Sequence, residues 1–173
     1  MAADTAWRLP EEEDTQKDRY LTFVVDGEGY GIEIRYVTEI IGMQPITPVP
    51  DMPPSFRGII NLRGTVIPVM DMRQRFSRAP AAYTDRTCIV VVDVTGVAMG
   101  LAVDTVSDVL HIDAAQVTEP PATLVSRDNR YIQGIGRVQE GVRLLLDCGR
   151  LLQRQELDRI ETISQEGTHE GLL

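Results

Sequence analysis

The chain contains few of the residues on which secreted domains and many enzymes depend. Its 173 residues include two cysteines and two histidines. Two cysteines are too few for the disulfide framework of a small secreted protein, and because Cys88 and Cys148 lie inside apolar runs we expect two buried free thiols. The shortage of histidine leaves little from which to build a zinc site or a histidine-based catalytic triad.

Long apolar runs and lysine are scarce as well. No run approaches the roughly 20 residues that a membrane-spanning helix needs, and the first residues lack the basic start and apolar stretch of a secretion signal. The chain carries 17 basic and 26 acidic residues, a net charge of −9, and its sole lysine is Lys17. An acidic protein of this kind is a poor ligand for nucleic-acid phosphates. We therefore expect a cytoplasmic protein that neither binds nucleic acid nor inserts into a membrane.

The acidic residues concentrate at the two ends of the chain. Residues 1–19 hold six acids and three bases, residues 153–173 hold five and two, and the body between them is nearly balanced. Because residues 1–19 also lack apolar periodicity, we predict that they form a disordered lead. Residues 164–173 are expected to fray.

Short apolar segments separated by glycine and proline turns predict an all-β fold. Aromatic residues make up only 5% of the chain, so aliphatic side chains must fill the core. The continuous apolar run Cys88–Val92 is typical of a strand buried on both faces, and Gly96 turns it into a second strand. Three further hairpins are expected, at residues 21–34, 58–70 and 132–146. Helical spacing of apolar residues predicts short helical turns at 35–41 and 105–110, and an amphipathic C-terminal helix at 151–163.

An internal repeat relates the two halves of the chain. Residues 30–41 resemble residues 99–110, and the hairpin at 58–71 resembles 134–147. Aliphatic strands often look alike by chance, but here the turn residues keep step with the strands. A barrel of about 65 residues buries too little surface to be stable by itself. We therefore predict two small five-stranded β-barrels, at approximately 20–80 and 85–150, packed together as one body.

The sequence contains no recognisable catalytic residue, metal site or cofactor site. An enzyme remains one alternative, because paired carboxylates perform acid–base catalysis, and the candidates are Asp93, Asp104 and Asp108. A nucleic-acid-binding barrel is another, although aromatic stacking platforms are lacking, and its basic cluster would be Arg73, Arg75 and Arg78. Scattered carboxylates more often cap turns, so the sequence favours a binding module.

One hairpin tip departs from the repeat. The turn Asn61–Gly64 reads NLRG, whereas its counterpart, residues 137–140, reads RVQE. An arginine beside glycine at such a tip is well displayed, and its planar guanidinium suits a partner's carboxylate or carbonyl groups. An ordinary solvated turn charge is the alternative interpretation.

Residues 56–71, FRGIINLRGTVIPVMD, resemble the R-G-x-x-N-L-R-G-x-x-x-P-V-x-D-L pattern of CheW-type chemotaxis coupling (adaptor) proteins. The segment Tyr30–Ile32 and the V-x-E-I run that starts at Val37 are similar to the same family. The resemblance extends over residues 20–163, and Met72 stands where the family has leucine.

The resemblance implies two packed five-stranded barrels and a non-enzymatic adaptor. Such a protein couples transmembrane chemoreceptors to a sensor histidine kinase by binding the cytoplasmic receptor tip and the regulatory domain of the kinase. It would be cytoplasmic, recruited to membrane-associated receptor arrays, and monomeric when free. An adaptor of another chemosensory system, for twitching motility or developmental signalling, is the alternative within the family. The residues implied for receptor and kinase binding are Val37, Glu39, Gly58, Asn61, Leu62 and Arg63, and those implied for the kinase contact alone are Ile41 and Met43.

Overall fold

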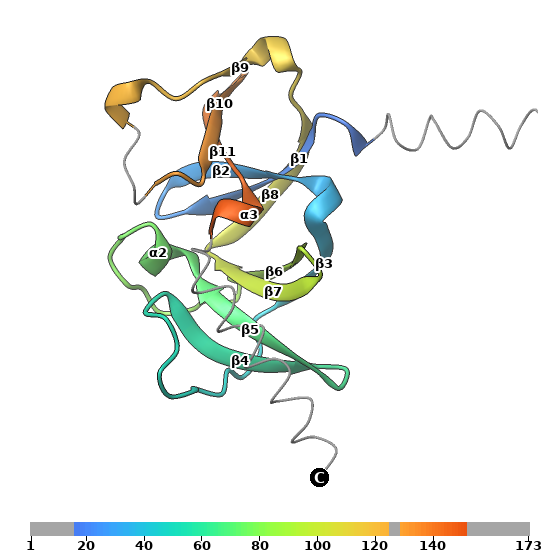
Figure 1. Cartoon of the computed structure of the whole chain (residues 1–173), viewed down its shortest axis with the longest axis vertical. Helices are drawn as coiled ribbons and strands as arrows, with labels where there is room; N and C mark the ends of the chain where they lie inside the picture. Colours follow the sequence, from blue (N-terminus) through green and yellow to red (C-terminus); the bar gives the residue numbers. More distant parts are fainter. Residues whose placement is uncertain (1–15, 125–128, 152–173) are drawn as a thin grey trace, which may run out of the picture.

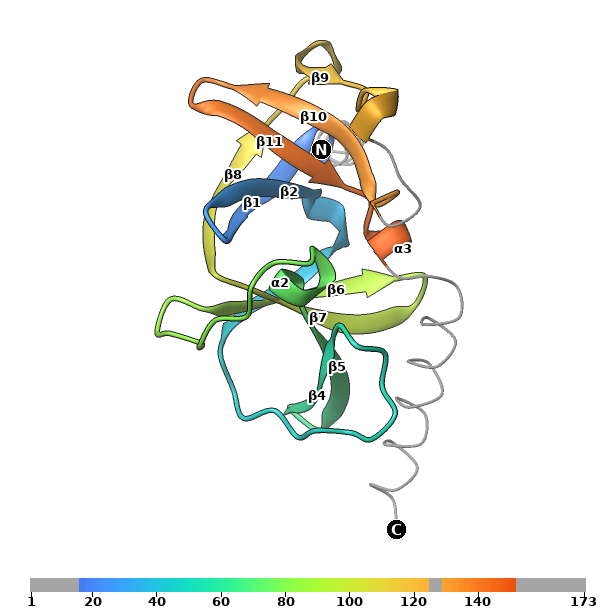
Figure 2. The same cartoon turned by 90° about the vertical axis from the view of Figure 1, so that its left-hand side faces the viewer.

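The structure, a computed structural model, describes residues 16–124 and 129–151, and most of its regular elements are strands. Two curved sheets lie one above the other along the long axis of the molecule (Figure 1; Figure 2). The predicted all-β class is confirmed. In the described part of the chain no helix has the length and apolarity to cross a bilayer. Most of the predicted lead, the C-terminal helix beyond Leu151, and the tail lie outside the described residues.

The upper sheet has six strands in the order β8-β1-β2-β11-β10-β9, and the lower sheet has five in the order β3-β6-β7-β5-β4. The strands of the upper sheet are β1 (Arg19–Val25), β2 (Glu28–Glu33), β8 (Thr105–His111), β9 (Val117–Thr118), β10 (Ile132–Val138) and β11 (Gly141–Leu146). Those of the lower sheet are β3 (Val37–Gly42), β4 (Phe56–Leu62), β5 (Thr65–Asp71), β6 (Cys88–Val94) and β7 (Val97–Val103). The short helices are η1 (Ile34–Tyr36), α2 (Met72–Arg75), η2 (Ala114–Gln116), η3 (Ala122–Leu124) and α3 (Cys148–Leu151). The two-residue strand β9 makes the upper sheet six-stranded rather than five-stranded.

The repeat is visible in the strand pairing, but its copies exchange strands. The chain crosses to the lower sheet between β2 and β3 and returns between β7 and β8. Each copy therefore gives its first hairpin to one sheet and its later strands to the other, so the units expected at 20–80 and 85–150 do not coincide with the sheets. Gly31 pairs with Leu145 in parallel, and its repeat equivalent Gly100 pairs in parallel with Val69, the equivalent of Leu145.

The main hydrophobic core lies between the two sheets. It includes Phe23 and Ile32 from the upper sheet and Val92 and Leu101 from the lower one, all fully buried. Alternate residues of β6 point the opposite way, so Ile89 joins a second cluster inside the lower sheet. The prediction of a strand buried on both faces is confirmed, because β6 contributes side chains to both clusters.

The helical turns predicted at 35–41 and 105–110 are wrong beyond the single turn of η1. Both segments are edge strands, β3 and β8, and each contains a register shift. In β3 the shift falls between Val37, which pairs with Val92, and Glu39, which pairs with Val91. An extra residue in a strand breaks its alternation of buried and exposed positions. The apolar residues then recur at a spacing that imitates a helix.

Candidate functional site

The tip of the β4–β5 hairpin displays Arg63. Arg63 and Gly64 have φ angles of +52° and +87°, the left-handed conformation that lets a two-residue turn follow the twist of its strands. The Asn61 side chain accepts a hydrogen bond at 2.8 Å from the backbone N–H of Gly64. Asn61 therefore stabilises the turn, and the Arg63 side chain is 69% exposed.

Arg63 forms a two-pronged ion pair with Glu39. Its Nη1 donates to Oε1 at 2.9 Å and its Nη2 donates to Oε2 at 2.5 Å. The hydrogen bond from Arg63, followed by its charge, lowers the pKa of Glu39 below the usual range even though some desolvation opposes the shift. Glu39 lies on β3 and the turn follows β4, the two edge strands of the lower sheet. The ion pair thus joins opposite edges of this sheet.

Apolar side chains lie on the strands that carry this pair and just beyond them. Leu62, Ile41 and Met43 are partly buried against the core inside the lower sheet, and Ile40 is 43% exposed. Val37, in contrast, packs against the core between the sheets. The structure therefore packs Leu62, Ile41 and Met43 against one cluster and Val37 against another.

Gly58 is buried and shapes the site from within. Its φ angle is +147°, and a Cβ atom there would lie 2.1 Å from the carbonyl oxygen of Thr47. Thr47 and Ile59 exchange two backbone hydrogen bonds of 2.9 Å. The glycine therefore lets the segment after β3 lie close alongside β4 in an antiparallel bridge, and the backbone that approaches it belongs to this same chain.

Two of the three carboxylates of the enzyme alternative, Asp93 and Asp104, are bound within the chain. Asp93 accepts a hydrogen bond from the backbone N–H of Gly96, as a turn cap does. Arg73 donates to both carboxylate oxygens of Asp104, at 2.9 and 2.6 Å. Burial tends to raise the pKa of Asp104, but hydrogen bonds from Arg73 and the Asp26 amide outweigh it and lower the pKa.

The predicted basic cluster does not form an open cationic surface. Arg75 donates to the carbonyl oxygen of Leu151 at 2.6 Å and stacks on the ring of Tyr131. Arg78 lies 3.8 Å from a carboxylate oxygen of Asp26. These arginines fasten neighbouring segments together.

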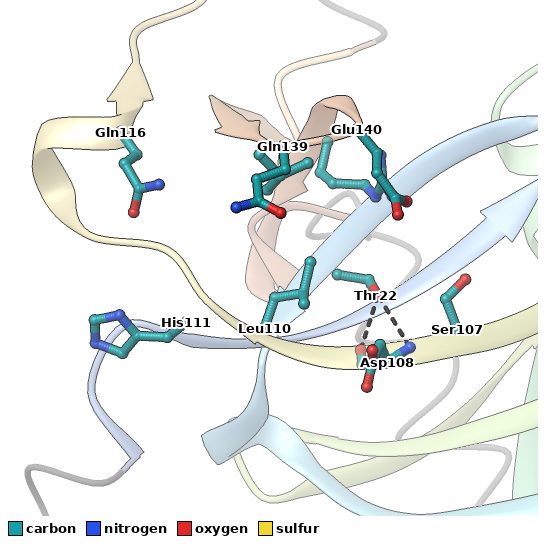
Figure 3. A pocket seen from close by; sticks show the side chains of 10 residues that line it. Thr22, Ser107, Asp108, Leu110, His111, Gln116, Gln139 and Glu140 are labelled. Carbon is teal, nitrogen blue, oxygen red and sulfur yellow. Dashed lines mark hydrogen bonds and ion pairs between the residues drawn. The ribbon is translucent and has the colours of Figure 1, made fainter.

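A pocket that was not predicted from the sequence lies at the mouth of the upper sheet, between β8 and the tip of the β10–β11 hairpin. Its volume is about 480 Å³, and its wall includes Asp108 on β8, Arg143 on β11 and Gln139 at the tip of the β10–β11 hairpin (Figure 3). The signal that could have revealed it is in the repeat: Asp108 aligns with Glu39, but Gln139 aligns with Arg63.

One group of side chains among the described residues has the spacing of metal ligands. Asp18, His111 and Asp113 each offer one ligand atom, and these atoms lie within 4.8 Å of one another. His111 and Asp113 are exposed. Exposed carboxylates often gather without a metal ion, so we assign no role to this group.

Comparison with known proteins places the whole described fold in one family. A family model described as the CheW-like domain matches residues 19–156. The chemotaxis protein CheW of Klebsiella aerogenes is 31% identical over 152 residues, which cover 88% of this chain and 92% of that protein. Protein FrzA of Myxococcus xanthus is 29% identical over 124 residues, which cover 70% and 74%.

A solved structure has the same architecture. The scaffolding protein TtCheW from Thermoanaerobacter tengcongensis superimposes with a TM-score of 0.73 at 30% sequence identity, over 80% of this chain and 94% of that one. Together with the match of the family model, this similarity confirms the resemblance that residues 56–71 indicate. The chain therefore belongs to the CheW-like domain family of chemotaxis adaptor proteins, which are scaffolds rather than enzymes.

Proposed function

We propose that this adaptor couples the cytoplasmic tip of a transmembrane chemoreceptor to the regulatory domain of a sensor histidine kinase. The observation that carries the proposal is the family match over residues 19–156, which includes the NLRG turn and its exposed arginine. In this role the protein is cytoplasmic, is recruited to receptor arrays and is monomeric when free.

The receptor contact is assigned to the surface around Arg63, Glu39 and Leu62. A guanidinium has five N–H donors, and Glu39 accepts from only two of the Arg63 nitrogens, so donors remain for a partner. The exposed side chain of Ile40 lies on the same edge strand. An amphipathic receptor helix would bury apolar groups here, while the charged pair would set its register. Val37 and Gly58, which are turned inward, would act by shaping β3 and β4.

The kinase contact is assigned to the neighbouring aliphatic face at Ile41 and Met43. Both side chains are partly buried, so they offer apolar surface without unfolding. One rigid body that holds two partners raises the effective concentration of each for the other. Coupling therefore needs no chemical step in the adaptor.

The test is the charge reversal Arg63→Glu, with Arg86→Glu as the matched control on another exposed arginine. We expect Arg63→Glu to keep the wild-type circular dichroism and to weaken co-sedimentation with receptor membranes and kinase about tenfold, the equivalent of about 1.4 kcal/mol. Arg86→Glu should sediment like the wild type. Normal sedimentation of Arg63→Glu would refute the assignment.

The similarity to FrzA supports a second candidate, an adaptor of another chemosensory system such as twitching motility or developmental signalling. A pull-down from host cytosol and membranes separates the two candidates by the receptor and kinase that it recovers.

A further inference from the structure

The pocket at the mouth of the upper sheet is the repeat equivalent of the place that Arg63 fills in the lower sheet. Asp108 pairs with Thr22 on β1, as its equivalent Glu39 pairs with Val91 on β6. The tip of the β10–β11 hairpin faces Asp108 across the pocket, but it carries Gln139 where the other copy has Arg63 (Figure 3). In the lower sheet an ion pair joins the hairpin tip to the edge strand, whereas in the upper sheet the equivalent position is an open pocket.

Asp108 is held firmly at the pocket wall. The Thr22 hydroxyl donates to the Asp108 carbonyl oxygen at 2.8 Å and accepts from the Asp108 N–H at 3.1 Å. Thr22 is only 1% exposed. The backbone that carries this carboxylate is therefore fixed before any ligand arrives, which reduces the entropy that binding must overcome.

Within the described residues, Asp108 is the charged group of this pocket that has no counter-charge. Arg143 lies 3.8 Å from Glu140, and His111 lies 3.3 Å from Asp113. The Asp108 carboxylate accepts a hydrogen bond from its neighbour Val109 at 3.0 Å and forms no ion pair in the described part of the chain. The pocket thus keeps a carboxylate at the position equivalent to Glu39 but has no cation at the position equivalent to Arg63.

The surroundings suit an arginine that belongs to a polypeptide. Leu110 and Val138 supply apolar wall for the methylene stem, which long basic side chains bury while their charged ends pair. β8 is an edge strand of the upper sheet, and Val109 on it is 45% exposed. An edge strand offers unpaired backbone groups to another chain, so a partner segment can lie beside the pocket.

We propose that this pocket accepts an arginine side chain of a partner polypeptide, whose guanidinium pairs with Asp108 as Arg63 pairs with Glu39. The inference does not depend on which receptor or kinase the adaptor couples, since it rests on the upper sheet alone. It predicts a second charged contact in the upper sheet, whereas the β4–β5 hairpin lies in the lower sheet (Figure 1).

The test is an NMR titration of the full chain with N-acetyl-arginine N-methylamide, with the matching citrulline compound as an uncharged control of the same shape. We expect saturable shifts at the amides of Asp108, Val109 and Gln139, at least threefold weaker binding of the lysine compound, and no saturation with citrulline. A capped Val-Arg-Val peptide should bind at least threefold more tightly than free arginine. If free arginine bound as tightly as the peptide, the pocket would be a site for a small cation, and the proposal of a polypeptide partner would be wrong.

Three variants complete the test. Asp108→Asn should abolish the saturable shifts, and Asp93→Asn, which changes a carboxylate of β6 in the lower sheet, should leave them intact. Gln139→Arg should also abolish binding, because it supplies the missing guanidinium from within the chain. Each variant's own spectrum reports whether it is folded. Saturable arginine binding that survives in Asp108→Asn or in Gln139→Arg, or no saturation in the wild type, would overturn the proposal.

Discussion

At the scale of single residues, the Arg63–Glu39 pair controls the ionisation of its own carboxylate. The hydrogen bond from Arg63 lowers the pKa of Glu39, so the pair is complete at neutral pH and is lost as the pH falls through this lowered pKa. In Arg63→Ala we expect the pKa of Glu39 to return to its ordinary range, as measured by carboxyl carbon NMR. Because both groups reach the surface, high salt should reduce the difference. An unchanged pKa in the variant would show that the pair does not persist in solution.

The two cysteines differ in reactivity for a reason that the sequence does not reveal. Cys148 is 1% exposed, and burial, assisted by Asp147 and Glu33, raises the pKa of its thiol to about 12. Cys88 is half-buried rather than buried, because it begins β6 at the margin of the sheet. Iodoacetamide at pH 8 should therefore label the native protein once, at Cys88, and the unfolded protein twice, as counted by mass spectrometry. In Cys88→Ser the native protein should remain unlabelled, and labelling there would contradict the burial of Cys148.

At the scale of elements, the β4 strand depends on the close backbone approach of Thr47 at Gly58. A Cβ atom would meet the Thr47 carbonyl at 2.1 Å, and a φ of +147° is unfavourable for any other residue. We expect Gly58→Ala to lower the free energy of unfolding by about 1–3 kcal/mol, measured in urea. The control is Gly42→Ala on β3, where a Cβ atom would have no neighbour within 4 Å. Equal losses in the two variants would show that the close approach does not require glycine.

Turn chemistry made the hairpins predictable, and irregular strands did not. Residues such as Gly64, Gly96 and Gly141 have positive φ angles in the structure, and glycine in the sequence marked each of these turns. The register shifts in β3 and β8 removed the alternation that identifies a strand, so both segments imitated helices. The sequence also does not show which strands of one copy pair with which strands of the other, because the two copies present similar apolar faces.

The candidate site was predictable only in part. Departure from the repeat singled out Arg63, and the family pattern added Glu39. Their ion pair could not be predicted, because β3 and β4 lie at opposite edges of a sheet and meet only when it curves. The pocket of the upper sheet could not be predicted for the same reason, since it depends on the curvature that brings Gln139 near Asp108.

At the scale of the whole molecule, the exchanged strands make the two sheets one cooperative unit. Leu101 is fully buried in the core that both sheets share, and removing most of its side chain should cost about 3 kcal/mol. In Leu101→Ala we expect the urea midpoint to fall equally for NMR signals of β4 in the lower sheet and β11 in the upper sheet, with a single transition for both. Ile60→Ala, which alters the core inside the lower sheet, should also shift both sets of signals together. If β4 lost its signals before β11, each sheet would unfold independently. The crossings between β2 and β3 and between β7 and β8 would then not couple the two sheets.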